Sequence, residues 1–196
     1  MAPESTPDPV CVALEFAGVL ERLGVAYVAA GSLASSVHGE PRSTDDIDLV
    51  ADLRSPHVGG LVAALADAYY TSADAVRDAV ARGGSFNAIH LATAVKVDVF
   101  VVGDDAFDAE RVARGRRTRI VQDPPHDLSV DTAEYTVLRK LEWFQRGGEV
   151  SDRQWRDVLG VVRAQREQLD GAVLATWAGR LGVSDLLERA LRDAAS

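Results

Sequence analysis

The sequence of 196 residues has little of what several classes of protein require. Its single cysteine, Cys11, rules out an intrachain disulfide framework and is compatible with the reducing cytosol. No apolar run is long enough to span a bilayer. Residues 1–9 are polar, acidic and proline-rich, unlike a signal peptide. We therefore expect a cytoplasmic protein with no membrane partner.

Positive charge is also scarce. The formal net charge of −9 argues against a protein that coats nucleic acid, because surfaces that follow phosphates are broadly basic. One short segment, residues 111–119, departs from this balance with five arginines: Arg111, Arg114, Arg116, Arg117 and Arg119. Two interpretations of these arginines remain open. They form either a local patch for an RNA or a nucleotide tail, or a solvated face that neutralises nearby acids.

The apolar residues, 47% of the chain, are ample for a hydrophobic core. We expect a disordered N-terminus over residues 1–9, followed by an α/β domain over 10–125. The run Asp123-Pro124-Pro125 indicates a boundary, and from 126 to 196 the apolar period is helical, which predicts a helical region packed on the domain. Within the α/β domain, one helix is expected over residues 55–70.

Three aspartates form the most informative pattern. Asp46 and Asp48 alternate with apolar residues on one predicted strand, so both point to the same face. Asp98 lies on a strand predicted to pair beside them. Bare carboxylates about 4 Å apart repel by roughly 4 kcal/mol per pair at an effective dielectric near 20, so the cluster either shares protons or holds cations such as Mg²⁺. The alternatives are a solvated loop end for the pair and an ion pair with Lys96 for Asp98.

Gly31-Ser32 supplies the features of a phosphate site. A buried strand predicted over residues 25–30 runs directly into this dipeptide, and a helical stretch follows. Glycine lets the backbone approach an anion closely, and the serine hydroxyl and the first helix amides can donate to phosphate oxygens. The simpler interpretation is a turn glycine followed by an N-cap serine.

Taken in order along the chain, these patterns resemble the nucleotidyltransferases of the DNA polymerase beta type. The resemblance covers the first two thirds of the chain and implies a mixed α/β sheet flanked by helices. It also implies transfer of a nucleoside monophosphate from an NTP, with two Mg²⁺ ions, or Mn²⁺, held by Asp46, Asp48 and Asp98. Gly31 and Ser32 would cradle the terminal phosphates, and Asp98 would act as the base.

The C-terminal part resembles the second half of the abortive-infection type nucleotidyltransferase toxins, through the segments 134–143 and 154–158. In that group a lysine faces the triphosphate and an aspartate lies near the base or the acceptor, which corresponds here to Lys140 and Asp157. A solvated surface position remains open for Asp157. Arg42 and Thr44 border the acidic strand, where they would fix a phosphate, orient Asp46 or stabilise the loop.

The resemblance implies an NTP such as ATP as donor, and an RNA (for example tRNA) or a protein hydroxyl as the favoured acceptor. It also raises the role of the toxin in a toxin–antitoxin pair, with an antitoxin as partner. Two alternatives remain: a small-molecule nucleotidyltransferase of the aminoglycoside type, and a nucleotide-binding regulatory or antitoxin-like protein with little turnover.

Overall fold

The computed structural model describes residues 9–195 and contains two compact units. Of these residues, 9–29 and 44–130 form the first unit, which we call the sheet unit, and 30–43 and 131–195 form the second, the helical unit. Residues 30–43 thus group with the C-terminal helices. The predicted limits 10–125 and 126–196 stay predictions. The predicted disordered N-terminus lies outside the described residues except for Pro9, which begins the first helix.

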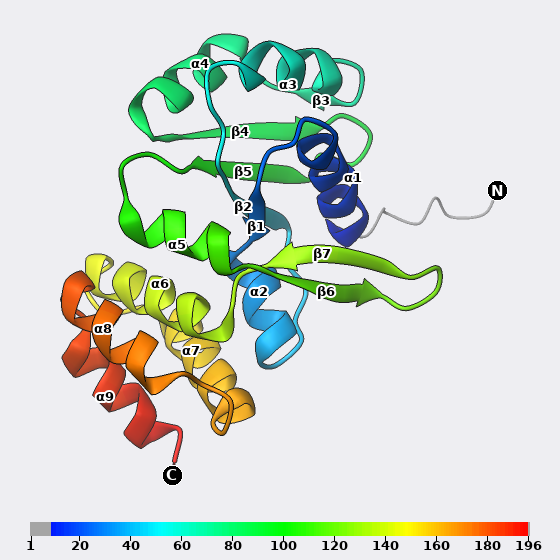
Figure 1. Cartoon of the computed structure of the whole chain (residues 1–196). Coiled ribbons are helices and arrows are strands. Elements are labelled where there is room, and N and C mark those ends of the chain that lie inside the picture. Colours follow the sequence, from blue (N-terminus) through cyan, green and yellow to red (C-terminus); the bar gives the residue numbers. More distant parts are fainter. Residues whose placement is uncertain (1–8, 196) are drawn as a thin grey trace. The chain divides into compact units, whose positions relative to one another are not determined.

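The sheet unit is built on a seven-stranded mixed sheet with the order β3-β4-β5-β2-β1-β7-β6 (Figure 1). β2 runs parallel to β5 and β1 parallel to β7, whereas the other neighbouring strands are antiparallel. The strands are β1 (Tyr27–Ala29), β2 (Asp46–Ala51), β3 (Tyr69–Tyr70), β4 (Ser85–His90), β5 (Lys96–Val101), β6 (Arg116–Val121) and β7 (His126–Val130).

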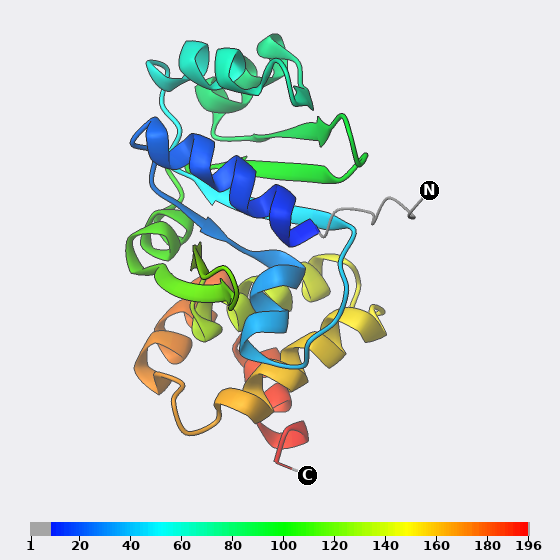
Figure 2. The same ribbon diagram turned by 90° about the vertical axis from the view of Figure 1, so that its right-hand side faces the viewer.

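From residue 9 onward, the sheet unit contains four helices: α1 (Pro9–Arg22), α3 (His57–Leu65), α4 (Ala73–Arg82) and α5 (Ala106–Arg114). Figure 2 shows α1 lying against one face of the sheet. Tyr27 of β1 donates a hydrogen bond to Glu21 of this helix. A Cβ at Gly115, which ends α5, would clash with Val28 of the same strand. Because neighbouring strand residues point to opposite faces, α1 and the end of α5 lie on opposite sides of the sheet.

The pairing of β2 with β5 determines which face of the sheet carries the aspartates. In β5, buried Val97, Val99 and Val101 alternate with the partly exposed residues between them. Ile47 and Leu49 of β2 lie opposite Val97 and Val99 and are fully buried, so these four apolar residues share one face. The acidic residues of β2 and β5 therefore share the other face.

The helical unit contains five helices within the described residues: α2 (Gly31–His38), α6 (Ala133–Arg146), α7 (Asp152–Gln165), α8 (Gly171–Leu181) and α9 (Ser184–Asp193). α6 and α7 pack along each other, and α2 contacts both. Their apolar stripes form a core that includes Leu138, Leu141 and Val161. Side-chain caps stabilise the N-termini of α7 and α8. The Ser151 side chain accepts a hydrogen bond from the Gln154 amide, and Asp170 accepts from the amides of residues 172 and 173.

The predicted fold class is confirmed: a mixed α/β sheet with flanking helices and a C-terminal helical bundle. The single helix predicted over residues 55–70 is wrong, because α3 ends at Leu65 and β3 follows. The hairpin β6–β7 was not predicted, and Asp123-Pro124-Pro125 lies in its turn. No helix within residues 9–195 combines the length and the apolar character needed to cross a membrane.

Candidate functional site

The acidic residues of the sheet unit are brought together by the pairing of β2 with β5. In this parallel register Asp48 lies opposite Asp98, and Asp46 lies opposite Lys96. Residues that alternate along a strand share a face, so three carboxylates and one ammonium group lie on the same face of two adjacent strands. Asp46 is exposed, whereas Asp48 and Asp98 are half-buried.

Lys96 is a cation inside this acidic group. Its Nζ lies 2.7 Å from Asp98 Oδ2 and 3.8 Å from Asp46 Oδ1. The hydrogen bond to Asp98 raises the pKa of Lys96; slight burial lowers it, and the charges of the three aspartates raise it further. Lys96 therefore carries a positive charge. The ion pair between Asp98 and Lys96, which was the alternative interpretation of Asp98, is present.

A divalent metal ion is the expected occupant of such a carboxylate group, and the donor chemistry fits, because Mg²⁺ and Mn²⁺ prefer oxygen ligands. The ligands are not preassembled: within residues 9–195, no group of three or more histidine, cysteine, aspartate or glutamate side chains is arranged to hold a metal ion. Alternate residues on a strand are about 6.6 Å apart, so Asp46 and Asp48 would converge on an ion only by side-chain rotation.

Two neighbours complete this part of the sheet unit. Thr44 Oγ1 donates a hydrogen bond of 2.9 Å to the backbone oxygen of Asp46, which fixes the chain where it enters β2. Asn87 of β4 lies opposite Asp98 on the side away from β2. Sequence reasoning missed Asn87. The signal that could have found it is the pairing of β4 with β5.

In the helical unit, Gly31 and Ser32 open helix α2. Gly31 has a φ of 55°, a left-handed conformation that favours glycine. The first helical hydrogen bond runs from the Ala34 amide to the Ala30 oxygen, so the amides of residues 31–33 have no acceptor within the helix. Ser32 is not the N-cap, which is Ala30. The Ser32 hydroxyl instead accepts a hydrogen bond from Arg42.

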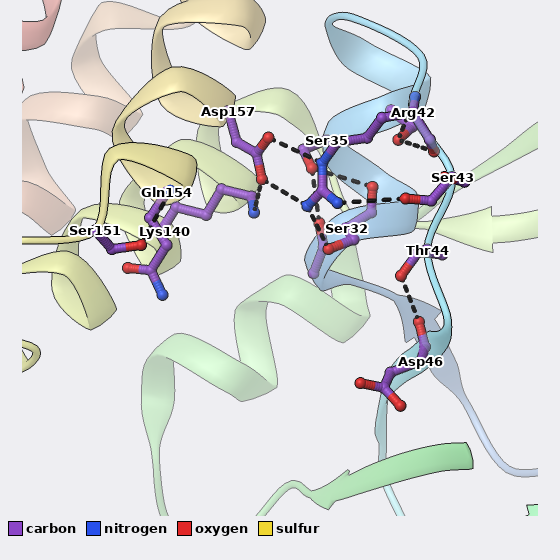
Figure 3. Close-up of polar contacts among 12 residues, drawn as sticks. Ser32, Ser35, Arg42, Ser43, Thr44, Asp46, Lys140, Ser151, Gln154 and Asp157 are labelled. Carbon is purple, nitrogen blue, oxygen red and sulfur yellow. Dashed lines mark hydrogen bonds and ion pairs between the residues drawn. The ribbon is translucent and has the colours of Figure 1, made fainter. Parts of the chain in front are cut away.

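Arg42, Lys140 and Asp157 form a cluster of charges beside Ser32, which Figure 3 shows and which we call the Asp157 cluster. Arg42 donates to both carboxylate oxygens of Asp157, from Nε at 3.0 Å and from a terminal nitrogen at 2.8 Å. The same terminal nitrogen lies 2.6 Å from Ser32 Oγ. Lys140 Nζ donates to Asp157 Oδ2 at 2.8 Å. These contacts connect α2, α6, α7 and the segment after α2 into one polar group.

Asp157 is thus a partner of two cations and not a solvated surface residue, since its side chain is only 10% exposed. Burial alone would raise the pKa of Asp157, but the hydrogen bonds and charges of Arg42 and Lys140 lower it below its ordinary value. One carboxylate and two cations leave the cluster with an excess of one positive charge. Such a group, with a serine hydroxyl beside it, suits an anion such as a phosphate.

The position of Arg42 depends on a residue that sequence reasoning missed. Ser36 Oγ donates to the backbone oxygen of Arg42 at 3.2 Å and accepts from its backbone amide at 3.4 Å. Ser36 therefore holds the segment after α2 against the helix. The place of Arg42 beside Ser32 suits the predicted phosphate role, and its role as an orienter of Asp46 stays a prediction.

The arginine-rich segment is neutralised by acids of the sheet unit. Arg111 pairs with Asp108 at 2.8 Å, and Arg114 pairs with Glu110 at 2.7 Å. The acids that pair with Arg117 and Arg119 come from other elements and are, respectively, Glu21 and Asp127. Four of the five arginines thus have a carboxylate partner, which favours the neutralising interpretation over a patch for RNA.

No family model matches the sequence, and no curated protein matches it. Solved structures that are similar in fold include the following three. An antigenic nucleotidyltransferase-like protein from Paracoccidioides brasiliensis is 17% identical, with a TM-score of 0.56 over 97% of this chain and 95% of its own. The solution structure of the antibiotic-resistance factor ANT(2'')-Ia is 13% identical, with a TM-score of 0.55 over 93% of this chain and 98% of that one. The crystal structure of ANT(2'')-Ia in complex with adenylyl-2''-tobramycin is 12% identical, with a TM-score of 0.56 over 87% and 97% of the two chains. The chain therefore has the fold of nucleotidyltransferase-like proteins.

Proposed function

We propose that this protein is a metal-dependent nucleotidyltransferase of the EC 2.7.7 type, which moves a nucleoside monophosphate from an NTP to an acceptor hydroxyl and releases pyrophosphate. The observation that carries the proposal is the register of β2 and β5, which makes Asp48 and Asp98 direct neighbours and keeps Asp46 on their face. The nucleotidyltransferase-like fold supports the same reaction class.

The metal would be held by Asp46 and Asp48. When bound, Mg²⁺ or Mn²⁺ would neutralise charge on the triphosphate and polarise its phosphoryl oxygens. Thr44 supports this role through its hydrogen bond to the Asp46 backbone, because that contact fixes where the strand begins.

The Asp157 cluster would bind the terminal phosphates of the nucleotide. Gly31 lets the backbone approach an anion, and Ser32, whose oxygen already accepts from Arg42, keeps its own hydroxyl proton for a phosphate oxygen. Arg42 and Lys140 supply the positive charge. Asp157 positions both cations, because its two oxygens accept from them.

The chemical step assigned to this chain is proton removal by Asp98. The carboxylate accepts the proton of the acceptor hydroxyl while the hydroxyl oxygen forms a bond to the α-phosphorus. The bond from the α-phosphorus to the bridging oxygen breaks, and pyrophosphate leaves with the electron pair. Lys140 offsets the negative charge that develops on the leaving pyrophosphate.

The acceptor is assigned by class. The toxin resemblance favours an RNA or protein hydroxyl and an antitoxin partner. Because the arginines at 114 and 117 are paired with acids, we favour the protein hydroxyl over RNA. A second candidate is a small hydroxylated molecule, favoured by the structural likeness to ANT(2'')-Ia, which was solved with adenylyl-2''-tobramycin. The remaining alternative is a nucleotide-binding regulator with little turnover.

The test is pyrophosphate release with each of the four NTPs and Mg²⁺ in the presence of tRNA, a cell protein extract or tobramycin. α-³²P-labelled NTP then shows which fraction receives the nucleotide. The matched control is the double variant Asp46→Asn/Asp48→Asn. We expect release by the wild type alone. Nucleotide binding with no release for any acceptor would favour the regulator, and equal release by both proteins would refute the assignment of these residues.

A further inference from the structure

The position of Lys96 is set by the sheet. It precedes Asp98 by two residues on β5, and its partner across the parallel register is Asp46. Both relations put the Lys96 side chain on the acidic face, and its Nζ lies within 4 Å of a carboxylate oxygen of each aspartate. The ammonium group is therefore built into the carboxylate group by strand geometry.

The composition of the chain makes this lysine unusual. Lysine occurs at only two positions, 96 and 140, and arginine supplies the other 19 of the 21 basic residues. Each lysine contacts an aspartate that the sequence predicted as a site residue: Lys96 lies 2.7 Å from Asp98 in the sheet unit, and Lys140 lies 2.8 Å from Asp157 in the helical unit. An ammonium is a compact point charge, unlike the planar guanidinium, so lysine is the side chain that best replaces a small cation.

The charges on the acidic face match one divalent ion. Three carboxylates and one ammonium give a formal charge of −2 on this face. One divalent ion makes the group neutral. The Lys96 ammonium already bonds to the Asp98 carboxylate. A second metal ion bound to Asp98 would lie close to this ammonium, and the two positive charges would repel each other.

We propose that the ammonium group of Lys96 takes the place of a second metal ion, so that the site binds one divalent ion through Asp46 and Asp48 while Lys96 orients Asp98. This inference rests on the proposed function and revises the two-ion arrangement that the sequence predicted. Lys96 acts through Asp98 and is therefore a positioning residue.

The first test is a titration of the full chain with Mn²⁺ alone, in which electron paramagnetic resonance measures free Mn²⁺. We expect one bound ion per wild-type chain. In Lys96→Met the ammonium is absent, so the affinity should rise at least tenfold and a second ion should bind. Lys96→Arg keeps the charge and should bind one ion, which separates the effect of charge from any effect on folding.

The second test follows Lys96 itself. Reductive methylation with ¹³C-formaldehyde labels the chain amines, and Lys96→Arg and Lys140→Arg assign the two lysine signals. On addition of Mg²⁺ the Lys96 signal should shift and keep the linewidth of an ordered group, because Lys96 stays beside Asp98. A narrow signal at the position of a solvated lysine would mean that the metal expels Lys96, which overturns the proposal.

The outcomes distinguish this inference from the proposed function. In one outcome Asp48→Asn abolishes Mn²⁺ binding, whereas Lys96→Met binds the same number of ions with the same affinity as the wild type. This result would refute the role of Lys96 and support the metal site. Binding of two Mn²⁺ ions per wild-type chain would also refute the role of Lys96 and support the metal site. No Mn²⁺ binding by either wild type or Lys96→Met would refute the metal site, and with it both proposals.

Discussion

Replacing Asp157 with asparagine tests the Asp157 cluster, because it removes one negative charge from between two cations and changes the side-chain volume little. In the wild type Arg42 and Lys140 both donate to Asp157 Oδ2, each at 2.8 Å, so their nitrogens are at most twice this distance apart. With the carboxylate gone, two like charges about 5 Å apart repel by roughly 3 kcal/mol at an effective dielectric near 20.

The expected loss of stability is somewhat smaller than this repulsion. Breaking a fully buried ion pair costs about 3–5 kcal/mol. Here the Asp157 and Lys140 side chains are 10% and 11% exposed, but Arg42 is 25% exposed and can turn toward water. We expect Asp157→Asn to lower the free energy of unfolding by about 2–3 kcal/mol. For a chain of this size that lowers Tm by roughly 4–12 °C in calorimetry.

The pH dependence follows from the lowered pKa of Asp157. A carboxyl group whose pKa is lower in the folded state stabilises the fold above its ordinary pKa, and this contribution is lost as the pH falls through the lowered value. The stability difference between wild type and Asp157→Asn should therefore be constant near neutral pH. It should shrink below about pH 4, where the unfolded carboxyl takes up its proton.

Asp152→Asn is the matched control, because Asp152 is exposed in the first turn of the same helix and its loss should cost less than about 1 kcal/mol. Tripolyphosphate should stabilise Asp157→Asn more than wild type, since the variant has two uncompensated cations. A loss of stability equal to that of the control, with no difference in the response to tripolyphosphate, would refute the assigned role of Asp157.

Three further predictions concern the acidic residues and the start of α2. Mg²⁺ should raise the Tm of the wild type and have little effect on Asp46→Ala/Asp48→Ala, and equal stabilisation of both proteins in thermal scans would contradict a metal site there. Asp98→Asn should bind NTP within about tenfold of wild type in calorimetry yet lose turnover by several orders of magnitude. A parallel loss of binding and turnover would make Asp98 a ligand of the metal and not the base. Gly31→Ala should lower stability by about 1–2 kcal/mol in urea unfolding, because alanine is strained at a φ of 55°, and an unchanged midpoint would mean that the helix start adapts.

The fold could be predicted where local pattern and tertiary packing agree. In β2 and β5 alternation placed the aspartates on one face and Ile47 and Val97 on the other, and burying these two residues together left few registers open. The hairpin β6–β7 gave no such signal. β6 is short and largely exposed, with three arginines in six residues, so no apolar face marked it as a strand.

The sequence by itself determined the residue types and their local faces. These are the acidic face of β2, the lysine two residues before Asp98, and the glycine at position 31, where the first residue of α2 has a left-handed backbone conformation. Only the tertiary structure decided the partners. Arg42 and Asp157 are 115 residues apart in the chain, and the period of helix α7 allowed a solvated position for Asp157 as well as a paired one. That choice depends on how α2, α6 and α7 pack, because an ion pair forms only where the folded core brings its two charges together and removes most of the water around them.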